Sequence, residues 1–199
     1  MKLYYTPGAC SLSPHIALKE AGIPHELVKV DLKTKTLASG EDYSKINPKG
    51  QVPALALDNG ELLTEGPVIV QVIADKAAGK NLAPANGTTE RYRLQEWLTF
   101  ISAEVHKTFS PLFNPTLTDE AKQVFRDRLA GKFKYLDSKL AGQDYLMGQQ
   151  FTVADGYLYT MLRWADRMKV DLSGFPHLTA YKERVAARPQ VQAAVQAEA

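Results

Sequence analysis

The spacing of apolar residues predicts alternating strands and helices at the start of the chain. Residues 3–5 are a short β-prone run, and apolar residues alternate with charged ones over 28–32, as in a half-buried strand. Between these runs, apolar residues at helical spacing begin near residues 11–13 and stop at Gly22. A strand, a helix and a second strand in this order predict a parallel pair joined by a right-handed crossover.

The next part of the chain predicts a loop, a hairpin and a helix. Residues 33–43 are mostly polar and predict a loop with room for a short helical piece. Residues 54–57 and 61–64 are β-prone runs around Asp58-Asn59-Gly60, and Asn-Gly supplies the positive φ that tight hairpin turns need. Pro67 then stands where proline commonly opens a helix. We therefore expect β-α-β followed by β-β-α.

Beyond the hairpin and its helix, only helical periodicity remains. Residues 79–88 are rich in glycine and proline and poor in apolar residues, which indicates a linker. Helical patterns then cover residues 90–107, 118–140 and 152–168, with two shorter ones that begin at Pro176 and Pro189. The sequence thus predicts an α/β domain over residues 1–80, a linker over 81–88 and an all-helical domain over 89–199.

Composition and charge are those of an ordinary globular protein. Apolar residues make up 45% and charged residues 23% of the sequence, which excludes a disordered or collagen-like chain. The formal net charge is +2 and Lys and Arg are not clustered, so we expect no nucleic-acid partner. The longest run without Asp, Glu, Lys or Arg, residues 3–18, is interrupted by prolines. We therefore expect no membrane span and no signal peptide, and we expect the cytoplasm as the compartment.

Cys10 is the only cysteine, so the chain cannot form an intramolecular disulfide. The four histidines show no zinc-type spacing, and we expect no metal. Cys10 lies between the first predicted strand and helix, where free N–H groups favour a thiolate; the alternative is a buried cysteine that acts as a small hydrophobe. Ser13 stands where a C-x-x-C motif would have its second cysteine. A reactive Cys10 would therefore need a partner thiol from another molecule.

Two motifs around the predicted hairpin could bind a peptide-like ligand. Gln51-Val52-Pro53 fits either a cis peptide that exposes the Val52 backbone to an extended peptide or a trans proline that opens a strand. Thr64-Glu65-Gly66-Pro67 fits either a site whose amides bind a carboxylate while Glu65 binds an ammonium, or a helix start whose acidic residue offsets the dipole. The zwitterionic head of an amino acid carries both of these charges.

A third motif concerns folding. Thr152-Val153-Ala154-Asp155 has the pattern of a capping box before an apolar helix. Asp155 is therefore predicted to stabilise the start of that helix and to take no part in chemistry.

Together these segments resemble those of cytosolic glutathione S-transferases. Lys-Leu-Tyr-Tyr-Thr-Pro-Gly-Ala-Cys-Ser, Asn-Pro-Lys-Gly-Gln-Val-Pro-Ala-Leu and Glu-Val-His-Lys are similar to segments of the bacterial beta class, and the resemblance covers essentially the whole chain. It implies a thioredoxin-like α/β domain followed by an all-α domain. It also implies a homodimer, with the first long helix of the helical domain near the two-fold axis. The implied reaction transfers the sulfur of glutathione, a co-substrate and not a cofactor, to small, mostly apolar electrophiles.

The resemblance also assigns site residues in the α/β domain. Cys10 matches the cysteine that contacts the glutathione sulfur and can form a mixed disulfide with it. Val52, after Gln51, matches the residue that pairs by its backbone with the cysteinyl part, and Lys35 matches the basic residue near the glycine carboxylate. Glu65 and its neighbour Gly66 match the pair that holds the γ-glutamyl head.

The helical domain contributes a second set. The residues of the first long helix that match the ligand site near the dimer interface are Thr99, Ala103, Glu104, Val105 and His106. Ala103, His106 and Lys107 share one face of a regular helix, although a solvated or packed helix surface is the alternative. Three positions depart from the usual pattern. Gly66 and Ala103 lack a hydroxyl, which leaves backbone donors at Gly66 and apolar contact at Ala103, and Thr99 is shorter than the usual Asn.

The sequence leaves more than one interpretation open for the acceptor pocket and for the type of reaction. Candidates for the pocket are Tyr5, Lys107, Arg163 and Trp164, and a tryptophan at helical spacing also fits the core. Cys10 and His106 are the candidate catalytic residues. Tyr5 and Ser11 are second candidates for activating glutathione, because other transferase classes use Tyr or Ser for this. Two further functions fit the residues. One is thiol–disulfide exchange or reductive dehalogenation through a Cys10 mixed disulfide, and the other is non-catalytic carriage of glutathione and hydrophobic ligands.

Overall fold

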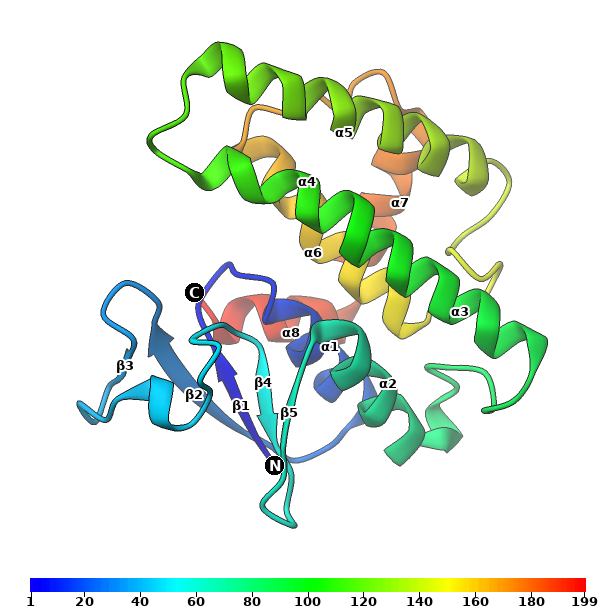
Figure 1. Cartoon of the computed structure of the whole chain (residues 1–199). Coiled ribbons are helices and arrows are strands. Elements are labelled where there is room, and N and C mark those ends of the chain that lie inside the picture. Colours follow the sequence, from blue (N-terminus) through cyan, green and yellow to red (C-terminus); the bar gives the residue numbers. More distant parts are fainter. The chain divides into compact units, whose positions relative to one another are not determined.

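A mixed five-stranded sheet organises the first part of the chain (Figure 1). The strands are β1 (Lys2–Tyr5), β2 (Glu26–Asp31), β3 (Thr36–Leu37), β4 (Ala54–Ala56) and β5 (Leu62–Thr64), in the spatial order β3-β2-β1-β4-β5. β1 and β2 pair in parallel across α1 (Leu12–Ala21), and the other pairs are antiparallel. The predicted parallel pair, the hairpin and the helix α2 (Gly66–Lys76) are confirmed.

The computed structural model describes all residues from 1 to 199. The chain divides into two units, residues 1–83 together with 189–199, and residues 84–188. The first unit is thioredoxin-like and the second is helical, as predicted. None of the helices is both long enough and apolar enough to cross a bilayer.

The edge strand β3 is one difference from the prediction, which gave residues 33–43 as a loop. Val30 pairs with Leu37 and Asp31 with Thr36. A strand of two residues is too short to show an alternating pattern, so its pairing partner and not its own sequence determines it. A 3-10 turn, η1 (Tyr43–Lys45), follows in the same segment.

The two faces of the sheet are covered by different parts of the chain. Tyr4 and Ala54 pair in register and share one face, where buried Tyr43 packs against them. Leu3 and Leu55 also pair in register, are fully buried and point to the opposite face, on the side of the helices. The sheet is therefore buried on both faces, and the segment around Tyr43 is held to it by apolar packing.

The second unit contains helices only. Its α-helices are α3 (Thr89–Phe100), α4 (Lys107–Phe109), α5 (Asp119–Leu140), α6 (Val153–Arg167) and α7 (Pro176–Ala186). The helix predicted over residues 90–107 is not regular, because Ile101–His106 is π-helical and joins α3 to α4. A π-helical turn changes the hydrogen-bond ladder without breaking the apolar pattern, so the sequence does not show it.

The last helix, α8 (Pro189–Ala197), is the second difference from the prediction, which assigned residues 89–199 to one helical domain. α8 packs against α1 in the first unit, with Val191 and Ala194 buried. Directly after it, Oε1 of buried Glu198 lies 2.9 Å from Nδ1 of buried His15. Helical periodicity shows that α8 has an apolar face but not which core receives that face.

Candidate functional site

Cys10 lies in the turn between β1 and α1. The turn is closed by the side chain of buried Ser11, whose hydroxyl accepts from the Thr6 N–H at 3.1 Å. The Cys10 thiol donates to the Val52 carbonyl at 3.2 Å. Cys10 keeps some solvent exposure, but the surrounding protein desolvates the sulfur and raises the pKa of the thiol to about 11, despite the opposing effect of nearby backbone N–H groups. Of the two alternatives for Cys10, the raised pKa favours a protonated, desolvated thiol over a stabilised thiolate in the chain without ligand.

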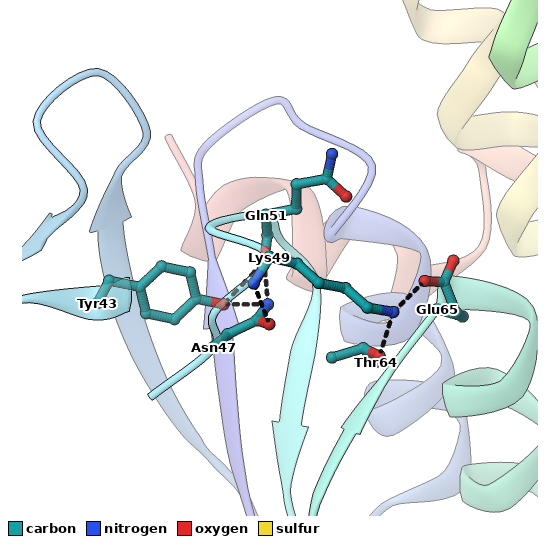
Figure 2. Close-up of polar contacts among 6 residues, drawn as sticks. All are labelled: Tyr43, Asn47, Lys49, Gln51, Thr64 and Glu65. Carbon is teal, nitrogen blue, oxygen red and sulfur yellow. Dashed lines mark hydrogen bonds and ion pairs between the residues drawn. The ribbon is translucent and has the colours of Figure 1, made fainter. Parts of the chain in front are cut away.

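The segment 47–52 forms a rigid loop beneath this thiol, which we call the 47–52 loop. Two side chains support its Gln51 carbonyl: the Tyr43 hydroxyl at 2.9 Å and the Asn47 amide at 2.8 Å (Figure 2). Both supporting residues are buried. The Val52-Pro53 peptide is cis, which resolves the two alternatives for that motif. Figure 2 shows the Gln51 side chain outside these contacts, so Gln51 acts here through its backbone.

Lys35 contacts the same loop from the other side. Its ammonium donates to the Gly50 carbonyl at 2.7 Å, and its own carbonyl accepts from the Tyr43 N–H at 2.8 Å. Gly50 has a φ of 58°, and a Cβ at this position would lie 3.5 Å from the Lys35 side chain. Glycine is favoured here because other residues rarely adopt this backbone conformation.

Glu65 precedes α2 and carries the candidate ammonium-binding carboxylate. It has a φ of 66°, and its carbonyl accepts from the Val68 and Ile69 N–H groups, both at 3.0 Å. Gly66 begins α2, where the first amides have no carbonyl one turn earlier to bind. The Glu65 carboxylate accepts from the Lys49 ammonium at 2.6 Å, and Lys49 also donates to the Thr64 hydroxyl at 3.0 Å (Figure 2).

The candidates in the first unit are thus linked by one element. The 47–52 loop contacts the Cys10 thiol, the Lys35 ammonium and the Glu65 carboxylate through three successive parts of its chain. The sequence reasoning did not single out Tyr43, Asn47 or Lys49. The Asn-Pro dipeptide at the start of the loop is a turn signal that points to this segment, but not to these contacts. Tyr5 is half-buried at the end of β1, and no hydrogen bond joins its hydroxyl to the loop.

His106 lies in the second unit at the end of the π-helical segment. Its Nδ1 is 2.8 Å from the Tyr157 hydroxyl, and its ring stands edge-on to Trp164 with the centroids 5.1 Å apart. Burial among these groups, with a smaller contribution from the charge of Lys107, lowers the pKa of His106 to about 4. The imidazole is therefore neutral at neutral pH.

The other candidates of the second unit do not form one face. In the π-helical geometry, Ala103 and Lys107 are exposed while His106 is half-buried, so the spacing of a regular helix does not apply. Val105 is fully buried, backbone included, so it offers no exposed group to a ligand. Glu104 is exposed and paired with Lys132.

Trp164 and its neighbours complete this set. Trp164 is buried and contacts Phe109 and Phe113, as expected for a core tryptophan, while Arg163 next to it is half-buried. Thr99 is exposed on α3.

A groove of about 1110 Å³ runs between α3, the π-helical segment and α5. Its lining residues are Arg93, Glu96, Trp97, Phe100, Glu104, Thr108, Asp127, Arg128, Gly131, Lys132, Tyr135 and Lys139. Three of the lining rings contact one another, with centroid separations of 6.1, 6.0 and 5.3 Å. Glu104 is the only candidate residue that lines it. No cluster of three or more His, Cys, Asp or Glu side chains is placed to hold a metal ion.

Comparisons with known proteins agree with this geometry. The family model "Glutathione S-transferase, N-terminal domain" matches residues 8–76, and "Glutathione S-transferase, C-terminal domain" matches residues 100–189. The protein "Glutathione S-transferase GstA" of Escherichia coli O157:H7 is 48% identical over 198 residues, which are 100% of this chain and 98% of that protein.

Two solved structures extend the match to the fold. A sphingomonad glutathione S-transferase complexed with glutathione has a TM-score of 0.96 and 49% identity, over 100% of this chain and 98% of that one. A bacterial beta-class glutathione S-transferase of Sphingomonas chungbukensis has a TM-score of 0.96 and 48% identity, with the same coverage. The resemblance found in the sequence is confirmed, and the chain belongs to the glutathione S-transferase family.

Proposed function

We propose that this transferase binds glutathione along the 47–52 loop and joins its sulfur to small, mostly apolar electrophiles. The observation that carries the proposal is the convergence of the Cys10 thiol, the Lys35 ammonium and the Glu65 carboxylate on one rigid loop. Each of the three has the chemistry to contact a different part of the tripeptide. A structural neighbour of 49% identity is complexed with glutathione, which supports the choice of ligand.

In this proposal the two ends of glutathione are bound by opposite charges. The γ-glutamyl ammonium binds the Glu65 carboxylate, and its carboxylate binds the backbone amides at Gly66 and the start of α2. The glycine carboxylate binds the Lys35 ammonium. The cysteinyl part pairs with the Val52 backbone, as an extended peptide does when it adds to an exposed strand edge.

The state of Cys10 favours transfer over disulfide exchange. A thiol whose pKa is raised to about 11 is protonated at neutral pH, so it is a poor nucleophile and a hydrogen-bond donor. Such a donor suits a glutathione thiolate bound beside it. The thiolate attacks the electrophilic carbon, a sulfur–carbon bond forms, and the leaving group departs with the electron pair of the bond that breaks. The contribution of Cys10 is then to hold and stabilise the thiolate.

The candidates for contact with the electrophile lie in the second unit. His106 is neutral and lies against Tyr157, and exposed Lys107 and half-buried Arg163 are further candidates. Thr99, Ala103 and Glu104 are exposed and so remain accessible to a ligand.

We propose a cytoplasmic homodimer that uses the groove between α3 and α5. The groove places a cluster of aromatic rings between charged side chains, and Tyr135, in this cluster, is 43% exposed. Interfaces commonly combine aromatic anchors with a charged rim.

Two measurements test the function. Calorimetric titration with glutathione should show saturable binding, and a chloronitrobenzene with glutathione should yield the thioether with release of chloride. Saturable binding without turnover on a panel of electrophiles would indicate a carrier. Turnover on disulfides that Cys10→Ala abolishes would instead indicate thiol–disulfide exchange.

A further inference from the structure

Lys49 is the one charged side chain of the 47–52 loop that the proposed function leaves without a role. Its ammonium lies 2.6 Å from a Glu65 carboxylate oxygen and 3.0 Å from the Thr64 hydroxyl (Figure 2). In the proposed function this carboxylate receives the ammonium of the γ-glutamyl head. Lys49 therefore presents the same chemical group as the ligand to the same acceptor.

The backbone on both sides of this ion pair is fixed. The Lys49 N–H donates to the Asn47 side-chain oxygen at 3.2 Å, and the Gly50 N–H donates to the Asn47 carbonyl at 2.8 Å. Buried Asn47 thereby anchors the loop on either side of Lys49. Glu65 is held as the residue that precedes α2, where its carbonyl accepts two amides. The pair can therefore form and separate by side-chain rotation alone.

The two side chains are also open to solvent. The Lys49 side chain is 51% exposed and the Glu65 side chain 64% exposed. An ion pair in this environment contributes little stability, because water solvates both charges when they separate and long side chains lose entropy when they pair. A ligand ammonium can thus replace the Lys49 ammonium on Glu65 at small cost.

We propose that Lys49 competes with the ligand ammonium for Glu65 and thereby sets the affinity of the site for glutathione. The inference rests on the proposed function, in which Glu65 binds the γ-glutamyl ammonium. When glutathione is absent, Lys49 neutralises Glu65. When glutathione binds, Lys49 leaves, and its side chain stays beside the head group without a direct ion pair to Glu65. The apparent affinity for glutathione is then lower than the intrinsic affinity of the site.

The size of the effect follows from the strength of an exposed ion pair. With the free energy usual for exposed ion pairs, the Lys49–Glu65 pair is formed in more than half of the ligand-free molecules. Only the remaining molecules, in which Glu65 is free of Lys49, can bind the ligand ammonium directly. Removal of the competing ammonium should then strengthen glutathione binding about two- to sixfold.

A double-mutant cycle on the full chain separates competition from general charge effects. The variants are Lys49→Met, Glu65→Gln and the combination of both, with glutathione titrated calorimetrically at low ionic strength. Lys45→Met is the control, because Lys45 is an exposed lysine near the loop whose side chain is not paired with Glu65. Lys49→Met should lower the Kd for glutathione about two- to sixfold when Glu65 is present and should not lower it when Glu65 is replaced by Gln. Lys45→Met should leave the Kd unchanged.

Each other outcome overturns the inference in a distinguishable way. If the parent binds glutathione and Glu65→Gln weakens it, but Lys49→Met leaves the Kd unchanged or raises it, Lys49 does not compete. If Lys49→Met strengthens binding equally in both backgrounds, Lys49 acts without Glu65. If the parent does not bind glutathione, or Glu65→Gln leaves its affinity intact, the proposed function fails and this inference fails with it.

Discussion

Replacement of Asp155 by alanine should destabilise the helical unit far more than the loss of a helix cap. The Asp155 side chain is fully buried. One carboxylate oxygen accepts from the Leu146 N–H at 2.9 Å and the Tyr181 hydroxyl at 3.0 Å. The other accepts from the N–H and hydroxyl of Thr152, at 2.7 and 3.0 Å. This carboxylate therefore joins the start of α6 to the chain before it and to α7.

The magnitude follows from these four donors. Loss of an N-terminal cap alone costs about 0.5–2 kcal/mol. Asp155→Ala would in addition remove this acceptor from the buried donors of Leu146 and Thr152, and each unsatisfied group costs about 1–3 kcal/mol; the Tyr181 hydroxyl would keep only the carbonyl of residue 155, at 3.3 Å. Water that enters the vacated space recovers part of this loss. We therefore expect the free energy of unfolding to fall by about 3–5 kcal/mol.

Urea unfolding followed by circular dichroism measures the change. The free energy of unfolding of Asp155→Asn should lie between those of the parent and Asp155→Ala. The amide oxygen still accepts hydrogen bonds on one side, while the NH₂ group faces donors on the other. Asp166→Asn is the control; its carboxylate is 77% exposed and paired with Lys182, so it should shift stability by less than about 0.5 kcal/mol. An Asp155→Ala protein with the urea midpoint of the parent but without transferase activity would show that Asp155 belongs to the site and that the reasoning is wrong.

The remaining predictions concern the site and the assembly. Because the pKa of Cys10 is raised to about 11, its thiolate fraction should grow with pH, and alkylation of the ligand-free protein by iodoacetamide should accelerate about tenfold per pH unit between roughly pH 7 and 10; a plateau below pH 8 would contradict this. Because the pKa of His106 is lowered to about 4, the imidazole stays neutral above roughly pH 5, and the turnover of His106→Gln should keep the pH profile of the parent between roughly pH 6 and 8 while its rate falls more than its glutathione affinity. Glu65→Gln and Lys35→Met should each weaken glutathione binding roughly tenfold to a hundredfold by calorimetry, and unchanged affinity in both would refute the assignment. Light scattering at micromolar concentration should give twice the chain mass, and a particle of 22.0 kDa would exclude the dimer.

Most elements of the fold follow from local sequence, because their signals are complete within one segment. The alternation around Val28 and Val30, the Asn59-Gly60 turn and Pro67 each specify a strand, a hairpin or a helix start without reference to the rest of the chain. β3 and the π-helical segment Ile101–His106 were not predicted. Both depend on partners elsewhere: β3 on the edge of β2, and the π-helical turn on the packing of the helical unit.

The sequence singled out candidate site residues that the structure brings to one loop, but it did not determine their electrostatics. Cys10, Lys35 and Glu65 were identified from motifs and a resemblance, and the structure links all three to the 47–52 loop. The state of the thiol could not be decided from the sequence, because a helix start favours a thiolate while the burial that raises the pKa of Cys10 is a property of the fold. Lys49 was missed because an exposed lysine in a turn has no distinctive sequence signal, and only the fold brings it to Glu65.

The packing of α8 on α1 also determines when the first unit can be completed. Residues 189–199 are synthesised after the whole of residues 84–188, so translation inserts the helical unit between two parts of the thioredoxin-like one. Until then the apolar face of α1 that receives Val191 and Ala194 lacks its cover, buried His15 lacks the Glu198 carboxylate, and the Gly8 N–H lacks the Glu198 oxygen that it reaches at 3.4 Å. The turn that carries the Cys10 sulfur is thus assembled from the earliest and the latest parts of the nascent chain, and an isolated fragment of residues 1–83 would not contain it in its final form.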